Sequence, residues 1–170
     1  MGISVENFIR LYKQNEKAKD KTFEEFINKH ITTKYINFIN KSVICDGIVN
    51  ATCHVKDGDR EIVKINSVNR YLFFIMKLIE NYTDIEFEDE KVSETYDELN
   101  KVGAISTLIA AIPEAEYSEF STILNMKMDD FRDNEYSLTA FLYNLKESLS
   151  ISEEVINSVL QELQKETNND

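Results

Sequence analysis

Proline and glycine are scarce in this chain, which has one Pro and four Gly among its 170 residues. All-β proteins use many of these residues at their turns, so this scarcity argues against an all-β fold. The hydrophobic fraction of 42% is ordinary for a globular protein. We therefore expect a globular protein built mainly from helices.

Histidine and the short motifs of common enzymes are sparse as well. Nucleophilic catalysis needs a base beside Ser, Cys or Thr, and the chain has two histidines, neither in a recognisable motif. No phosphate-binding loop and no dinucleotide-binding glycine pattern occurs in the sequence. Carboxylates are so numerous that pairs occur at any spacing, which makes them uninformative about acid–base catalysis. We expect a protein that is not an enzyme and uses no cofactor.

Cysteine is limited to Cys45 and Cys53. Together with His30 and His54 they are the candidate metal ligands, but their spacing matches no zinc-binding pattern. Cys45 falls on an apolar face of an expected helix, where buried thiols are common. We therefore expect no metal site, and two reduced, structural thiols in a cytosolic protein.

Basic side chains are outnumbered, because 19 Lys and Arg stand against 31 Asp and Glu, for a formal net charge of −12. Proteins that bind nucleic-acid backbones gain affinity from Lys and Arg, so direct binding of this kind is not expected. Two interpretations stay open. The charge either serves solubility, or it forms an acidic surface that binds a basic partner or imitates a nucleic acid.

Long apolar runs are also missing. The densest one, residues 66–82, is too short for a membrane span and is interrupted by Arg70, Lys77 and Glu80. The first residues show no basic region followed by an apolar stretch, so we expect neither a signal peptide nor contact with a membrane.

Residues 66–82 instead predict a central helix. Ser67 is the expected N-cap, because its hydroxyl can accept from amides of the first turn. Apolar residues cover most of the circumference of this helix, as in a helix that other elements contact from several sides. They are Val68, Tyr71, Leu72, Phe73, Phe74, Ile75, Met76, Leu78, Ile79 and Tyr82.

Helical spacing of apolar residues predicts further helices on both sides of this one. They are expected at residues 4–17, after Thr22, at 38–52, around 92–99, at 104–112, from Pro113 through Phe131, at 136–149, and from Ser150 or Ser152 onward. The period changes to two at residues 53–65, where an Asp-Gly pair predicts a hairpin turn. The predicted fold class is a mainly α, compact single-domain multi-helix bundle over residues 1–170, with one short β-hairpin and a frayed tail at 167–170.

Acidic residues concentrate between Asp84 and Glu98. Such a run usually forms a solvated face, but here Ile85 and Phe87 alternate with the acids and could anchor a basic, partly apolar protein partner. The segment is therefore the predicted contact surface. Its predicted partner-binding residues are Asp84, Ile85, Glu86, Phe87, Glu88, Asp89, Glu90 and Glu94.

Three stretches of the chain share a pattern with other proteins. They are Asn66 and Ser67 with residues 70–73, residues 82–86, and residues 112–114 continuing to Phe120, residues 128–131, Asn134 and Glu135. Through these stretches most of the chain resembles a group of small acidic, largely uncharacterised proteins of tailed phages and prophages of low-GC Gram-positive bacteria. The resemblance implies a phage protein made in the host bacterial cytoplasm, with the virion as a further location. It supplies no catalytic residue.

The expected function is that of a non-enzymatic phage interaction protein with a structural or accessory role in virion assembly. The alternative is an inhibitor of a bacterial defence complex, of the anti-CRISPR kind or another, whose acidic surface imitates a nucleic acid. The two hypotheses differ in the partner, which is a virion protein in the first and a host nuclease or sensor in the second.

Overall fold

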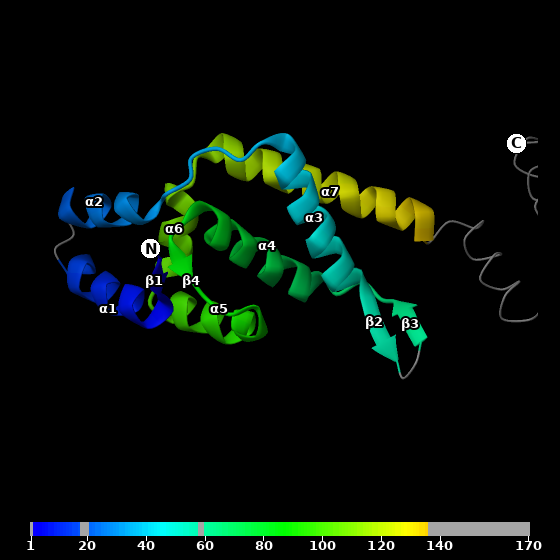
Figure 1. Ribbon diagram of the computed structural model, residues 1–170, viewed down its shortest axis with the longest axis horizontal. Coiled ribbons are helices and arrows are strands. Elements are labelled where there is room, and N and C mark those ends of the chain that lie inside the picture. The colour runs from blue at the N-terminus through cyan, green and yellow to red at the C-terminus, as the bar shows by residue number, and fades with distance from the viewer. Residues whose placement is uncertain (1, 18–20, 58–59, 136–170) are drawn as a thin grey trace, which may run out of the picture. The chain divides into compact units, whose positions relative to one another are not determined.

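The computed structural model describes residues 2–17, 21–57 and 60–135, and in this part of the chain it has seven α-helices and one β-hairpin (Figure 1). The predicted mainly helical fold class with a hairpin is confirmed. The predicted helices at 136–149 and from Ser150 or Ser152, and the tail at 167–170, lie outside the described residues. Residues 1–125 form one compact unit, and a second unit starts at Met126.

Helix α4 (Ser67–Tyr82) is the central helix of the first unit. It contacts α3 (Phe38–Cys53), α5 (Val92–Lys101), α6 (Ala104–Ala111) and β4 (Ile85–Glu86), and Figure 1 shows it between α3 and α5. Its buried side chains are Phe74, Ile75, Met76, Leu78, Ile79 and Tyr82. The central position predicted for this helix is therefore confirmed.

Two details of α4 differ from the prediction. Its N-cap is Asn66, whose side-chain oxygen accepts from the backbone N–H of Asn69 at 3.0 Å, so the assignment of Ser67 was wrong by one residue. Val68 and Tyr71 are 78% and 54% exposed, although the ring centroid of Tyr71 lies 6.4 Å from that of Tyr96 of α5. The buried side chains of α4 thus all lie from Phe74 onward.

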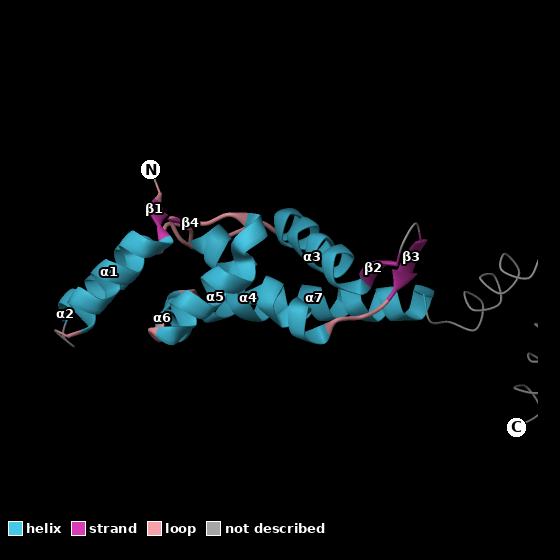
Figure 2. Cartoon of the chain, turned by 90° about the horizontal axis from the view of Figure 1, so that it is seen from below, coloured by secondary structure: helices cyan, strands magenta, loops and turns pink. Residues whose placement is uncertain are grey.

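Helices α1 (Val5–Glu16) and α2 (Lys21–His30) pack through aromatic rings. Phe8 is fully buried and its ring centroid lies 5.7 Å from that of Phe26 and 5.3 Å from that of His30. Strand β1 (Ile3–Ser4), directly before α1, pairs in parallel with β4, as Figure 2 shows. This second strand pairing was not predicted, because two residues are too few to show a period of two.

The predicted hairpin at residues 53–65 is confirmed. Strands β2 (His54–Asp57) and β3 (Arg60–Val63) are antiparallel, with His54 opposite Val63 and Asp57 opposite Arg60. The hairpin joins the end of α3 to the start of α4, and a bond from the backbone N–H of Asn66 to the carbonyl of Thr52 closes its base at 2.8 Å. Because the chain reverses at the hairpin, the end of α3 lies beside the start of α4. The two helices pack against each other.

The last described elements continue around α4. A short 3₁₀ helix η1 (Asp89–Lys91) leads into α5, and Gly103 joins α5 to α6 with a φ of 77°, a conformation that glycine adopts without strain. Helix α7 (Glu114–Glu135) begins directly after Pro113, whose carbonyl accepts from the N–H groups of Glu116 and Tyr117. The helices predicted at 104–112 and from Pro113 are thus confirmed to within one residue at these boundaries.

We expect reduction to leave the stability of this protein unchanged, as the sequence also predicted. Cys45 and Cys53 are both buried on α3, eight positions apart, which corresponds to about 12 Å along a helix. A disulfide requires a Cα separation of about 4.4 to 6.8 Å, so these two thiols cannot be bridged while α3 is intact. Thermal melts with and without a reductant should coincide, and a lower melting temperature under reduction would contradict this.

Candidate functional site

The predicted contact surface between Asp84 and Glu98 divides into buried and exposed residues. Asp84 lies at its start, and its Oδ1 is 2.7 Å from Nδ1 of His30, whose side chain is buried. The backbone N–H of Asp84 also donates to the carbonyl of His30 at 3.2 Å. Asp84 therefore holds α2 against the end of α4, whatever contact it makes with a partner.

Ile85 is 3% exposed and lies in strand β4, opposite Ile3 of β1. Its side chain belongs to the protein's own core, so truncating it would affect folding first. Phe87, the other predicted anchor, is half-buried. Of the two apolar residues in the predicted contact surface, only Phe87 is partly exposed to solvent.

The other predicted partner-binding residues are exposed carboxylates. Two of them have cationic neighbours, because Glu88 pairs with Lys91 at 2.6 Å and Asp89 with Lys77 at 3.5 Å. Exposed ion pairs contribute little to stability, so these carboxylates are free to exchange partners. The exposed set, hereafter the acidic cluster, is Glu86, Glu88, Asp89, Glu90 and Glu94.

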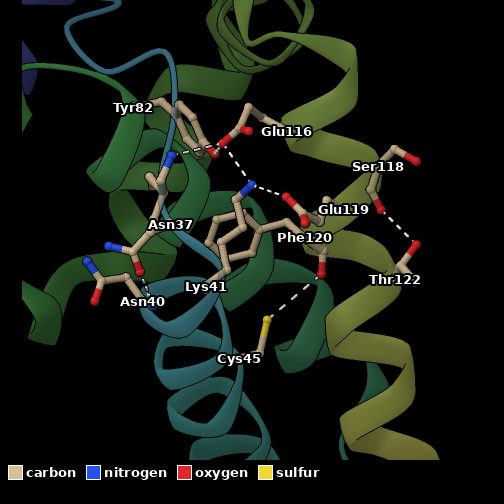
Figure 3. Close-up of polar contacts among 11 residues, drawn as sticks. Asn37, Asn40, Lys41, Cys45, Tyr82, Glu116, Ser118, Glu119, Phe120 and Thr122 are labelled. Atoms are coloured by element: carbon tan, nitrogen blue, oxygen red, sulfur yellow. Dashed lines mark hydrogen bonds and ion pairs between the residues drawn. The ribbon is translucent and has the colours of Figure 1, made fainter.

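A buried ionic network within residues 1–125 was not predicted. Lys41 of α3 has a fully buried side chain, and its Nζ is 2.9 Å from Oε2 of Glu116 and in contact with Oε2 of Glu119, both on α7 (Figure 3). The same Oε2 of Glu116 accepts from the hydroxyl of Tyr82 at 2.5 Å and from the backbone N–H of Ile36 at 3.0 Å. One carboxylate thus joins α3, α4, α7 and the segment before α3.

The rings of Tyr35 and Phe120 complete the surroundings of Lys41. Their centroids lie 5.3 and 5.9 Å from Nζ, within the range of cation–π attraction. With two carboxylates and two rings around it, the buried ammonium is neutralised and has no open side. We interpret the network as structural, because a catalytic group must be able to reach a substrate.

The network changes the titration of its members. Burial raises the pKa of the Tyr82 hydroxyl, and its hydrogen bond to Glu116 raises it further. For Glu116, burial opposes ionisation, but bonds from Tyr82, Lys41 and the N–H of Ile36 outweigh it and lower the pKa below the ordinary value. For Lys41, burial lowers the pKa, but bonds to Glu119 and Glu116 outweigh it and raise the pKa.

These directions predict how stability depends on pH. Because the pKa of Glu116 is lower in the folded protein, its contribution is complete above the ordinary value of 4.5 and is lost as the pH falls through the folded value. We expect the melting temperature of the wild type to fall faster than that of Glu116→Gln between about pH 5 and 3. Parallel curves would show that ionised Glu116 contributes nothing to folding.

The sequence carries one signal for this network. Lys41, Cys45, Ile48 and Thr52 share one buried face of α3 at positions i, i+4, i+7 and i+11. A lysine in register with a buried face needs a buried anion. The sequence alone does not identify that anion, because Glu116 is one of several acids in the first turns of α7.

The described residues offer no metal site, since no group of three or more His, Cys, Asp or Glu in them could hold an ion. Cys45 and Cys53 are buried on α3, while His30 is engaged with Asp84. No helix in this part of the chain is both long and apolar enough to cross a bilayer.

Comparisons with known proteins do not add to this geometry. No protein-family model, no curated protein and no solved structure matches the chain.

Proposed function

We propose that this chain is a non-enzymatic, phage-encoded interaction protein that acts as a structural or accessory component in virion assembly. The observation that carries the proposal is the acidic cluster. Its five carboxylates are exposed, while Ile85 in the same segment is buried in the core. Such a surface attracts a basic partner and orients it. The phage origin rests on the resemblance of the sequence to small acidic phage proteins.

A second candidate is an inhibitor of a bacterial defence complex. It is favoured by the same exposed carboxylates, because a row of anionic groups can occupy a site that normally binds phosphates. Recovering the partner from phage-infected cells separates the two candidates. Virion proteins support the assembly role, and a host nuclease or sensor supports the inhibitor.

The contact surface is tested by charge reversal. We expect Glu86→Lys, Glu88→Lys and Glu90→Lys together to lower the association rate of the recovered partner about tenfold at low salt, because steering depends on opposite charge. The melting temperature should change little, since all three side chains are exposed. Binding kinetics measured on an immobilised partner at two salt concentrations provide the readout.

A matched control carries the same change in net charge elsewhere. Glu16, Glu24 and Glu25 are exposed on α1 and α2, and their reversal to Lys should slow association less. Added salt should remove the difference, because it screens exposed charges beyond about 8 to 10 Å. Equal slowing in both triple variants would mean that only net charge matters, and the acidic cluster would then be a solvated face.

A further inference from the structure

The surface between α3 and α4 is hollowed along its length. One hollow of about 490 Å³ lies beside the start of α3, and a second of about 440 Å³ lies between the two helices. Ile44 and Asn81 line both, so the hollows are continuous. A third, of about 460 Å³, shares Glu80 with the second. Together they make one groove, hereafter the α3–α4 groove.

Apolar side chains are exposed at one end of the α3–α4 groove. Tyr35 and Val43, which line it, are 68% and 63% exposed, and the neighbouring Phe38 and Ile39 are 61% and 72% exposed. Exposed apolar residues scattered singly need no explanation, but Tyr35 and Val43 both line the first hollow and so share one surface. No element in the described part of the chain covers them.

The middle of the groove is open at Gly47. A Cβ placed on this residue would meet no atom within 4 Å, and its φ lies in the ordinary helical range. Neither packing nor backbone conformation therefore requires glycine here, although glycine weakens a helix interior. Gly47 and Phe73 both line the second hollow, so a large side chain at position 47 would enter it.

The part of the groove beside the C-terminal end of α4 is acidic. Glu80 and Asp89 line the second hollow, and Asp84 and Glu86 line the third. The one cation that lines these two hollows is Lys77, whose Nζ is already engaged by Glu80 at 2.7 Å and Asp89 at 3.5 Å. Four carboxylates against one ammonium leave this end negatively charged.

We propose that the α3–α4 groove binds an amphipathic helix of a partner protein, with its apolar side chains over Gly47 and its basic side chains toward Glu80 and Asp89. Grooves between two helices accept such a helix through anchors at i, i+3, i+4 and i+7. The residues of α3 that line the first two hollows run from Asn40 to Ala51, so the groove spans about 17 Å, or three turns of a bound helix. The inference rests on the proposed interaction function and names the chemistry of the partner.

Charge selects this occupant over a second copy of the chain. Each copy carries a net charge of −12, so two acidic groove ends would repel each other. A nucleic acid is excluded by the same sign of charge. A helix with Lys or Arg on one flank and apolar residues on the other complements both the exposed apolar side chains and the acidic side chains that line the groove.

The test fills the groove without disturbing the fold. A fluorescent peptide of about 16 residues, with Leu at helical spacing and Lys along one flank, is titrated with each variant and followed by anisotropy. Gly47→Leu should weaken binding about tenfold or more, because its side chain occupies the space of an anchor. Gly47→Ala is the matched control and should bind like the wild type, and both variants should melt no lower than the wild type.

A second pair of variants tests the acidic end. Glu80→Gln with Asp89→Asn should weaken peptide binding more than Glu24→Gln with Glu25→Gln, which removes the same charge from α2. Equal losses in the two pairs would show nonspecific attraction and overturn the proposal. Full binding by Gly47→Leu, or no binding by the wild type, would also overturn it.

Two further results separate this inference from the proposed function. If a partner recovered from infected cells binds Gly47→Leu as tightly as the wild type, the interaction function stands and the groove is not its site. If sedimentation shows a wild-type dimer that Gly47→Leu dissociates, a second copy occupies the groove and the proposed helix does not. Loss of the recovered partner's binding with Gly47→Leu, but not with Gly47→Ala, supports the proposal.

Discussion

Glu116→Ala should lower the free energy of unfolding by about 3 to 5 kcal/mol, the usual effect of removing one partner of a buried ion pair. The Glu116 carboxylate serves Lys41, the hydroxyl of Tyr82 and the N–H of Ile36. Without it, two neutral donors lose their acceptor, and Lys41 keeps a single carboxylate. Chemical denaturation at neutral pH, with the slope of the transition held constant, measures the change.

Glu119→Ala is the matched comparison on the same helix. The Glu119 side chain is 46% exposed and contacts Lys41 alone, so its loss should cost about 1 kcal/mol. The double variant Lys41→Met with Glu116→Gln should recover much of the stability lost in Glu116→Ala. It removes the buried charge and keeps an acceptor for Tyr82 and Ile36. Similar losses in Glu116→Ala and Glu119→Ala would contradict the central place of Glu116.

The network also fixes the positions of the two helices that wall the α3–α4 groove, the proposed partner site. Lys41 and Glu116 fix the start of α3 against α7, and Tyr82 fixes the end of α4 to the same carboxylate. The two helices that wall the α3–α4 groove are therefore positioned by contacts beneath it. The side chains that line the groove can then remain exposed and bind the proposed partner without a change of fold. This lowers the entropic cost of association.

The helices and the hairpin could be predicted from the sequence because their signals are local. The apolar run in α4 and the change of period at the hairpin both lie within one segment. The pairing of β1 with β4 could not be predicted, since Ile3 and Ile85 are far apart in the chain and each strand has two residues. The buried face of α4 was also predicted too wide, since Val68 and Tyr71 are 78% and 54% exposed.

For the candidate site, the sequence predicted an exposed acidic segment but not which residues of that segment are buried. The dense run of acids from Asp84 to Glu98 was expected to be solvated, and seven of its eight acids are exposed. The sequence could not show that Ile85 faces the core and Asp84 binds His30, because both contacts depend on distant segments. The α3–α4 groove was missed for the same reason, since it forms only when two helices meet across the hairpin.

Ile75→Ala should lower the free energy of unfolding by about 2 to 5 kcal/mol, through lost burial and the cavity that remains. Ile75 is 3% exposed and lies in the middle of α4, where other elements contact the helix from several sides. Its neighbours cannot all move to fill the space, because each also packs against the rest of the core. Urea or guanidinium unfolding of the variant measures the loss.

Two positions on the same helix provide a graded comparison. Leu72 is half-buried, so Leu72→Ala should cost less than Ile75→Ala. Val68 is 78% exposed, and Val68→Ala should change stability by no more than about 0.5 kcal/mol. The order Ile75, Leu72, Val68 follows burial and not helix propensity, since Ala is the better helix former in all three. A different order, or no loss at Ile75, would mean that α4 does not occupy the centre of the core.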